Sequence, residues 1–138
     1  MNIDEINQRA FLAQMKINMC GTLFAITYKN SFVSMVAKKD IMDKIGNIRK
    51  NSNEELDFYK ELQRQFIENK PLDIDLLRLS FIIDAQKKLI DELITLLNTS
   101  DLTTGYKRKM LKCIRAGLID ALNPQANESK SATHKRMV

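Results

Sequence analysis

Apolar residues recur every three or four positions along most of this chain, in stretches separated by short polar segments. Such spacing places the apolar side chains on one face of an α-helix. The 138 residues include only four Gly and two Pro, whereas a β-sandwich or barrel needs more turn residues. We therefore expect an all-α fold. It should comprise a bundle of four or five helices over residues 1–122 and a flexible, disordered basic tail over residues 123–138.

The longest apolar stripe belongs to a long amphipathic N-terminal region and runs from Leu12 to Ile48, with Lys29–Asn30–Ser31 as a candidate break. A β-hairpin over residues 22–36 is the alternative, because β-branched and aromatic residues flank that break. The turn lacks the Asn-Gly or Asp-Gly dipeptide of tight hairpins, so helix is favoured. A small bundle cannot easily cover so long a stripe. We therefore expect it to pair with a second copy of the chain or with another protein.

A helix is predicted over residues 53–69. Ser52 and Glu55 have the spacing of a capping box, in which each side chain bonds the backbone N–H of the other residue. Leu56, Tyr59, Leu62 and Phe66 follow at helical spacing. The helix should end at Asn69–Pro71, because the residue before proline is disfavoured in the α conformation.

The most apolar helix is predicted over residues 72–98, with apolar side chains around about half of its circumference. That width implies at least two neighbouring helices, so we expect this helix to be the central element. Lys88 and Glu92 belong to its charged i,i+4 pairs, which mark the solvent side. Gln86 falls near the middle of the apolar face. Its buried amide either fixes the helix register, the favoured interpretation, or faces a groove that a partner fills.

The last helix is predicted over residues 103–122, between a cap at Asp101 or Thr103 and the stop at Asn123–Pro124. Cys113, Gly117 and Ala121 recur at i, i+4 and i+8. Such a strip of small side chains lets another helix backbone approach closely. Cys113 and Cys20 should then be small buried hydrophobes, not reactive thiols.

The charge of the chain is concentrated at its C-terminal end. Residues 101–138 hold eight Lys and Arg against three acids, whereas residues 1–100 are balanced, so this end carries the net charge of +5. A basic end attracts anionic partners. The candidate partner-binding or anion-binding residues of the last helix are Arg108, Lys109, Lys112, Arg115 and Ile119. The alternative is a charged face that is only solvated.

The residue types that most enzymes use are missing or poorly placed. His134 is the single histidine and lies in the predicted tail, so triads and His-based zinc sites are not expected. Thr103–Thr104–Gly105 lacks the remainder of a phosphate-binding loop. The acid pairs Asp73/Asp75 and Asp91/Glu92 suit a helix cap and an exposed face better than a metal. We expect no cofactor, no metal and no enzymatic activity.

The N-terminus, Met-Asn-Ile-Asp-Glu, lacks the positive charge of an export signal, and no apolar run approaches the about 20 residues of a membrane span. Two unclustered cysteines suit a reducing compartment, so a cytoplasmic location is expected. These observations favour a non-catalytic helical interaction module, an adaptor, accessory factor or regulator. Its partner would be another protein or a second copy of the chain. The alternative is a protein that binds nucleic acid or another polyanion through the last helix and tail.

Overall fold

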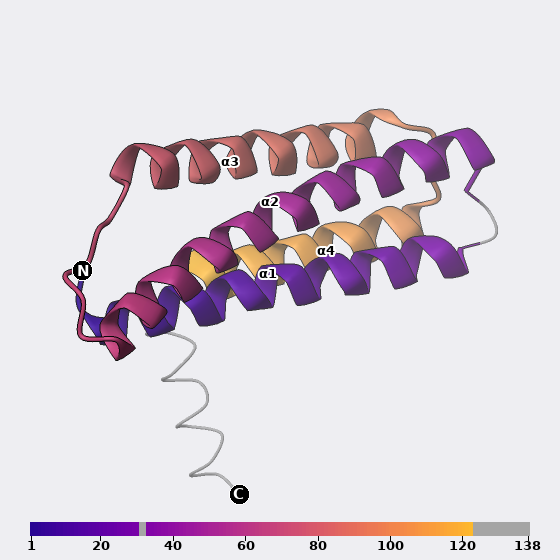
Figure 1. The fold of residues 1–138 in the computed structure, drawn as a ribbon. Coiled ribbons are helices and arrows are strands. Elements are labelled where there is room, and N and C mark those ends of the chain that lie inside the picture. Colours follow the sequence, from indigo (N-terminus) through magenta and orange to yellow (C-terminus); the bar gives the residue numbers. More distant parts are fainter. Residues whose placement is uncertain (31–32, 123–138) are drawn as a thin grey trace, which may run out of the picture.

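The computed structural model describes residues 1–30 and 33–122, and the side chains of residues 119–122 are outside that description. Its helices are α1 (Ile3–Lys29), α2 (Met35–Ile67), α3 (Leu76–Thr99) and α4 (Thr104–Leu122). The described residues contain no strand (Figure 1). The prediction of an all-α bundle is therefore confirmed. The predicted tail at 123–138, with His134, falls outside the described residues.

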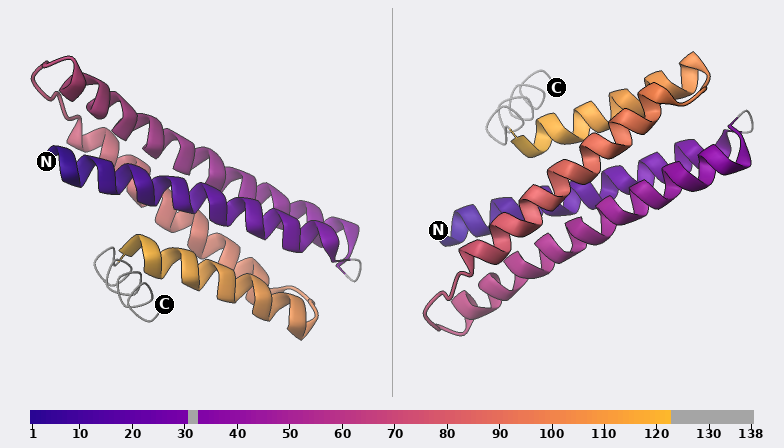
Figure 2. Two further views of the ribbon diagram at one scale, coloured as in Figure 1. Left: turned by 90° about the horizontal axis from the view of Figure 1, so that it is seen from below. Right: turned by 90° about the horizontal axis from the view of Figure 1, so that it is seen from above.

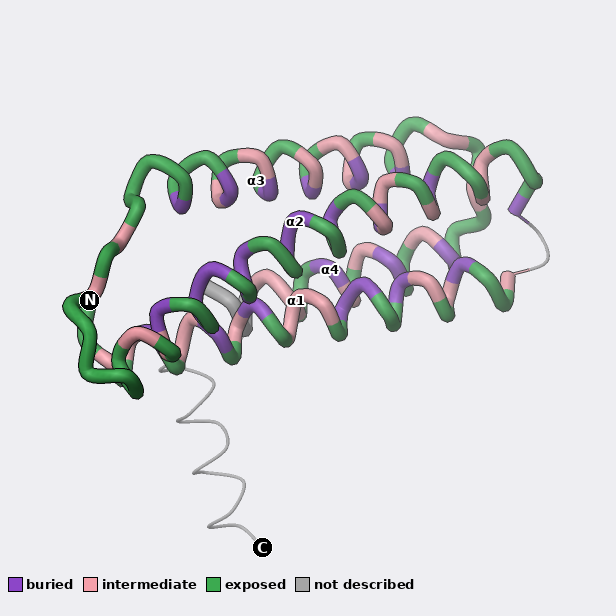
Figure 3. Tube along the Cα trace, in the orientation of Figure 1, coloured by how far each residue is buried: buried purple, intermediate pink, exposed green. Residues whose placement is uncertain are grey.

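Successive helices run in opposite directions, and each packs against the next (Figure 1). Seen from below, α1 lies nearest the viewer between α2 and α4, with α3 behind them (Figure 2). The helix pairs with the more extensive contacts are α1–α2, α2–α3, α3–α4 and α4–α1, and α3–α4 is the sparsest of these four. The largest interface is α1–α2, so the prediction that residues 72–98 form the central element is wrong. The buried positions of α3 lie along its inner side only (Figure 3).

Helix boundaries follow local side-chain chemistry. Three helices begin at a side chain that accepts a hydrogen bond from a backbone N–H three residues on, which satisfies one unpaired donor of the first turn. These caps are Asn2 for α1 (2.8 Å), Ser34 for α2 (3.2 Å) and Asp75 for α3 (3.0 Å). Beyond the end of α2, Asn69 adopts a left-handed φ of 58° and the Lys70 N–H bonds the Gln65 carbonyl at 2.9 Å. This closure confirms the stop predicted before Pro71.

Two sequence-based interpretations fail in the structure, a helix start and a strand pair. The chain does not begin a helix at Ser52, because α2 is continuous from Met35 and Ser52 is fully buried within it. Its hydroxyl donates to the Ile48 carbonyl at 2.9 Å instead of capping. The hairpin alternative also fails, since residues 22–29 are in α1 and residues 35–36 begin α2. Tertiary burial overrides strand propensity there: Leu23 and Thr27 are both fully buried.

The break predicted at Lys29–Asn30 is confirmed. It divides the long N-terminal apolar stripe between two helices. Helices α1 and α2 fold back on each other, so the two halves of the stripe cover one another. Leu23 in α1 and Ile41, Ile45 and Ile48 in α2 are all fully buried. The expectation that this stripe needs an outside partner is therefore wrong.

The core divides into two apolar clusters. The larger draws on all four helices and lies toward the α1–α2 connection; it includes Leu23, Ile45, Leu97 and Met110. The described members of the smaller cluster come from α1, α2 and the start of α3 with its preceding loop, and include Ile6, Tyr59, Leu62 and Leu79. Between the two, each of α1, α2 and α3 contributes polar side chains.

The close approach predicted for the small residues of the last helix is confirmed at Gly117. A Cβ atom there would overlap the Met19 side chain of α1, whereas a Cβ at Gly21 would meet nothing within 4 Å.

Cys20 is buried and Cys113 half-buried, both as free thiols. Burial raises the pKa of Cys20 to about 11, which disfavours the reactive thiolate.

These two glycines provide a matched test of the packing. Gly21→Ala should raise the free energy of unfolding by about 0.5–1 kcal/mol, because alanine costs less backbone entropy inside a helix. Gly117→Ala should lower it by about 1–2 kcal/mol, because Met19 must move. Urea unfolding monitored by circular dichroism measures both values. Equal stabilisation by the two substitutions would contradict the α1–α4 contact.

Candidate functional site

A layer of polar side chains crosses the middle of the bundle. Lys16 comes from α1, Ser52 and Glu55 from α2, and Gln86 from α3. Glu55 and Gln86 are 5% and 4% exposed, and the Lys16 side chain is 14% exposed. We call these four residues the polar layer. Buried charged and amide groups are stable only when they are paired, so their partners decide what the layer can do.

Lys16 is the hub of the polar layer. Its Nζ lies 3.1 Å from Glu55 Oε1 and 2.6 Å from Gln86 Oε1. The Gln86 amide donates from Nε2 to Ser52 Oγ at 3.0 Å, with a longer 3.5 Å contact to Glu55 Oε1. The Lys16–Glu55 ion pair thus links α1 to α2, and the Gln86 amide links α3 to both.

Tyr59 and Asn51 extend the polar contacts on either side of the layer. The Tyr59 hydroxyl donates to Glu55 Oε2 at 3.3 Å. Burial and the neighbouring Glu55 carboxylate raise the pKa of Tyr59 to about 12, so it remains a neutral donor. Asn51 Nδ2 donates to the Ile82 carbonyl at 3.1 Å, and Asn51 Oδ1 has no hydrogen-bond partner among the described residues. Both carboxylate oxygens of Glu55 therefore accept hydrogen bonds. The buried oxygen of the Asn51 amide accepts none from the described residues.

The polar layer opens into a cleft between α3 and α4, with a volume of about 340 Å³. Its walls are formed by residues of α3 together with Leu118 of α4, and Lys16 of α1 lines it as well. The α3 residues are Ile83, Gln86, Lys87, Ile90 and Asp91. Among the four neighbouring helix pairs, α3 and α4 make the sparsest contact. We call it the α3–α4 cleft.

Both interpretations of Gln86 therefore describe real features of its surroundings. The amide is bonded across helices, as a register-fixing residue must be, and it also lines a cleft. Lys16 was missed in the sequence. The sequence does contain an indication. Positions 16 and 17 lie three or four residues from buried Ala13 and Cys20, so helical periodicity predicts apolar residues there, and Lys16 is an exception.

The candidate residues of α4 do not form one surface. Arg108, Lys112 and Arg115 are exposed and line one groove of about 470 Å³, together with Lys107, Leu111 and Thr104, which the sequence interpretation did not include. We call this the basic groove. Its lining contains no acid, and its four cations make no ion pair within the described part of the chain.

Lys109 does not line the basic groove. Lys109 lines a separate depression with residues of α1, including Thr22, Ala25 and Lys29. Ile119 lies in α4, but its side chain is outside the described residues. Of the four candidate residues whose side chains are described, three line the same groove and Lys109 does not.

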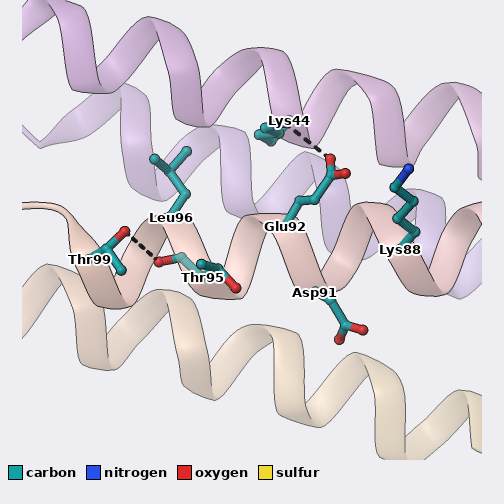
Figure 4. Close-up of a pocket in the computed structure, with 7 residues that line it drawn as sticks. All are labelled: Lys44, Lys88, Asp91, Glu92, Thr95, Leu96 and Thr99. Carbon is teal, nitrogen blue, oxygen red and sulfur yellow. Dashed lines mark hydrogen bonds and ion pairs between the residues drawn. The ribbon is translucent and has the colours of Figure 1, made fainter.

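The outer surface between α2 and α3 carries a further depression of about 670 Å³ (Figure 4). Lys44 Nζ lies 3.1 Å from Glu92 Oε2 there, and Asp91 points to the opposite side of α3, toward α4. Glu92 thus bonds across helices, not with Lys88 at i,i+4 as the sequence suggested. The lining mixes two lysines, two acids and two threonines, with no unbalanced charge.

Two general properties bear on function. Within residues 1–30 and 33–122, no three His, Cys, Asp or Glu side chains gather closely enough to hold a metal ion. No helix in this part of the chain combines the length and the apolar character that crossing a bilayer requires.

Double substitution tests whether the polar layer acts as a unit. Lys16→Met should lower the free energy of unfolding by about 3–5 kcal/mol, because Glu55 is left buried without its partner. Adding Glu55→Gln removes that charge, so the double variant should be more stable than Lys16→Met alone. Urea unfolding of the parent, both single variants and the double variant gives the coupling energy.

The exposed pair Lys44–Glu92 provides the control, with side chains 36% exposed on both partners. Its coupling should stay below about 1 kcal/mol. Additive effects at Lys16 and Glu55 would show that the two side chains do not share a buried bond.

Comparisons with known proteins do not assign a family. No protein-family model, no curated protein and no solved structure matches the chain significantly.

Proposed function

We propose that this chain is a non-catalytic protein-interaction module, an adaptor, accessory factor or regulator that binds another protein or a second copy of itself. The observation that carries the proposal is the outer face of α3 near its start. Leu77 is 85% exposed and Phe81 is 76% exposed. They are four residues apart, so they project from the same face of α3.

The end of α2 and the start of α3 lie at the same end of the bundle (Figure 1), and further exposed large apolar residues belong to these two helix ends. Leu76, Phe66 and Ile67 are each about half or more exposed. Single exposed apolar residues are ordinary on a protein surface, but a group of large ones marks an interaction site. Leucine and phenylalanine projecting from a rigid helix can serve as anchors in an apolar recess of a partner.

The opposite end of the bundle provides a comparison surface. Tyr28, Met35 and Val36 are also strongly exposed, beside residues 31–32, which the structure does not describe. A docking site is better supported on α3, because its two anchors share one face of a continuous helix with capped ends.

Charge substitution on α3 tests the proposal. Leu77→Lys with Phe81→Lys should abolish self-association or partner capture, because a lysine cannot enter an apolar recess without losing its hydration. Sedimentation velocity at micromolar concentration measures self-association. Quantitative capture on immobilised protein measures partner binding.

The matched control is Met35→Lys with Val36→Lys, which makes the same chemical change at the other end. It should leave both readouts unchanged, and circular dichroism should show both variants folded. A monomeric parent with no partner, or equal losses in the two double variants, would rule out docking on α3.

A second candidate function is polyanion binding by the basic groove. It is favoured by the four cations of α4 that line the groove without an acid among them and without an ion-pair partner in the described chain. Thr104 adds a hydroxyl donor at the start of α4. Phosphate contacts of this kind bind nucleic acid without reading its sequence.

Replacing Arg108, Lys112 and Arg115 with Glu should abolish binding to single-stranded and duplex oligonucleotides, and should leave the fold intact because all three side chains are exposed. Binding by the parent should weaken with salt as expected for about three to five phosphate contacts. Fluorescence anisotropy across a salt series measures both effects.

The control replaces exposed Lys39, Lys50 and Lys60 of α2 with Glu, which gives the same total charge. Equal losses in the two triple variants would indicate net charge alone, not the groove.

A further inference from the structure

We propose that the α3–α4 cleft binds a small, uncharged and mostly apolar molecule that carries a hydrogen-bond acceptor. This site is separate from the exposed residues of α3 and from the basic groove, so the inference goes beyond the proposed function. It rests on three properties of the cleft: its shape, the unused donor of Lys16 and its charge balance.

The shape suits a ligand of one or two rings or a short branched chain. The volume of about 340 Å³ lies at the lower end of the range for small-molecule sites. Ile83 and Ile90 from α3 and Leu118 from α4 supply apolar walls on opposing helices. Because α3 and α4 pack only sparsely, a molecule between them would gain apolar contacts that the two helices do not make with each other.

Lys16 supplies the polar end of the site. An ammonium group carries three N–H donors, and those of Lys16 reach two protein acceptors, Glu55 Oε1 and Gln86 Oε1. No third acceptor is present among the described residues, and Lys16 lines the cleft. The amide of Gln86 is already used, with its oxygen accepting from Lys16 and its nitrogen donating to Ser52. A ligand acceptor would therefore bond the ammonium group of Lys16.

Charge balance selects an uncharged ligand. Lys16 is paired with Glu55, and the cleft also contains one cation and one acid of α3, Lys87 and Asp91. These four groups sum to no net charge. A ligand carboxylate would have to lose its hydration close to the carboxylates of Glu55 and Asp91. A ketone, amide or ester oxygen avoids that cost and still accepts the bond.

The test uses a neutral fluorescent ketone, 6-propionyl-2-(dimethylamino)naphthalene, whose emission moves to the blue when it leaves water. We expect saturable binding of one molecule per chain. The dissociation constant should be on the order of 10–100 μM, as expected for a ligand of this size. The anionic dye 8-anilinonaphthalene-1-sulfonate should compete poorly for this site, because its sulfonate is charged.

Two variants block the cleft from opposite walls, Leu118→Trp from α4 and Ile83→Trp from α3. Each should weaken binding of the ketone at least tenfold, and circular dichroism and thermal unfolding identify whichever variant remains folded. The double variant Lys16→Met/Glu55→Gln keeps the cleft apolar and removes the donor without leaving a buried charge. It should weaken binding about tenfold and shift the bound emission further to the blue, because the ketone loses its hydrogen bond.

Leu77→Lys/Phe81→Lys is the control, since it removes the exposed apolar side chains of α3 that the dye could also contact. Its affinity for the ketone should equal that of the parent. The inference is overturned if the parent shows no saturable binding. It is overturned equally if a folded cleft-blocking variant binds as the parent does, or if the control variant is the one that loses binding.

Discussion

The buried contact of Lys16 with Glu55 and Gln86 is the constraint on which the arrangement of the helices depends. Apolar side chains tolerate small sliding movements between helices, but a buried ion pair does not, because a displaced carboxylate or ammonium group is left without a partner. The pair joins α1 to α2, and Gln86 joins α3 to both, 70 residues away from Lys16 in sequence. We infer that this polar layer fixes the register of three helices between the two apolar clusters. Helix α4 is attached differently, through Gly117 against Met19 and the Thr27–Tyr106 hydrogen bond of 2.7 Å.

Most of the fold could be predicted from helical periodicity and end signals. The break at Lys29–Asn30, the cap at Asp75 and the stop before Pro71 are local features, and each could be read from a few neighbouring residues. The start predicted at Ser52 failed for an instructive reason. Serine followed three residues later by glutamate is typical of a helix start, but the same two side chains also suit a buried polar layer. Only Lys16 and Gln86, on other helices, decide between these uses.

The candidate sites were harder to predict because each depends on side chains from several helices or on exposure. Gln86 was conspicuous in the sequence, since an amide on an apolar face requires a partner. Lys16 also occupies a position where the repeat predicts an apolar residue, but it was missed because a lysine on an amphipathic helix is ordinarily solvated. The positions of Arg108, Lys112 and Arg115 followed from i,i+4 and i+7 spacing, whereas the separation of Lys109 depends on how α4 turns toward α1. The exposure of Leu77 and Phe81 could not be predicted from the sequence. Periodicity shows that a helix has a wide apolar surface, but not how much of that surface other helices cover.

Exchange of the Gln86 side-chain amide protons, followed by nuclear magnetic resonance, tests the central role of the polar layer most directly. If the layer is formed in solution, these protons should exchange with solvent far more slowly than those of exposed Gln14 and should show contacts to Ser52. Exchange of the Gln86 protons as fast as that of the Gln14 protons, without contacts to α2, would contradict a buried polar layer joining the three helices.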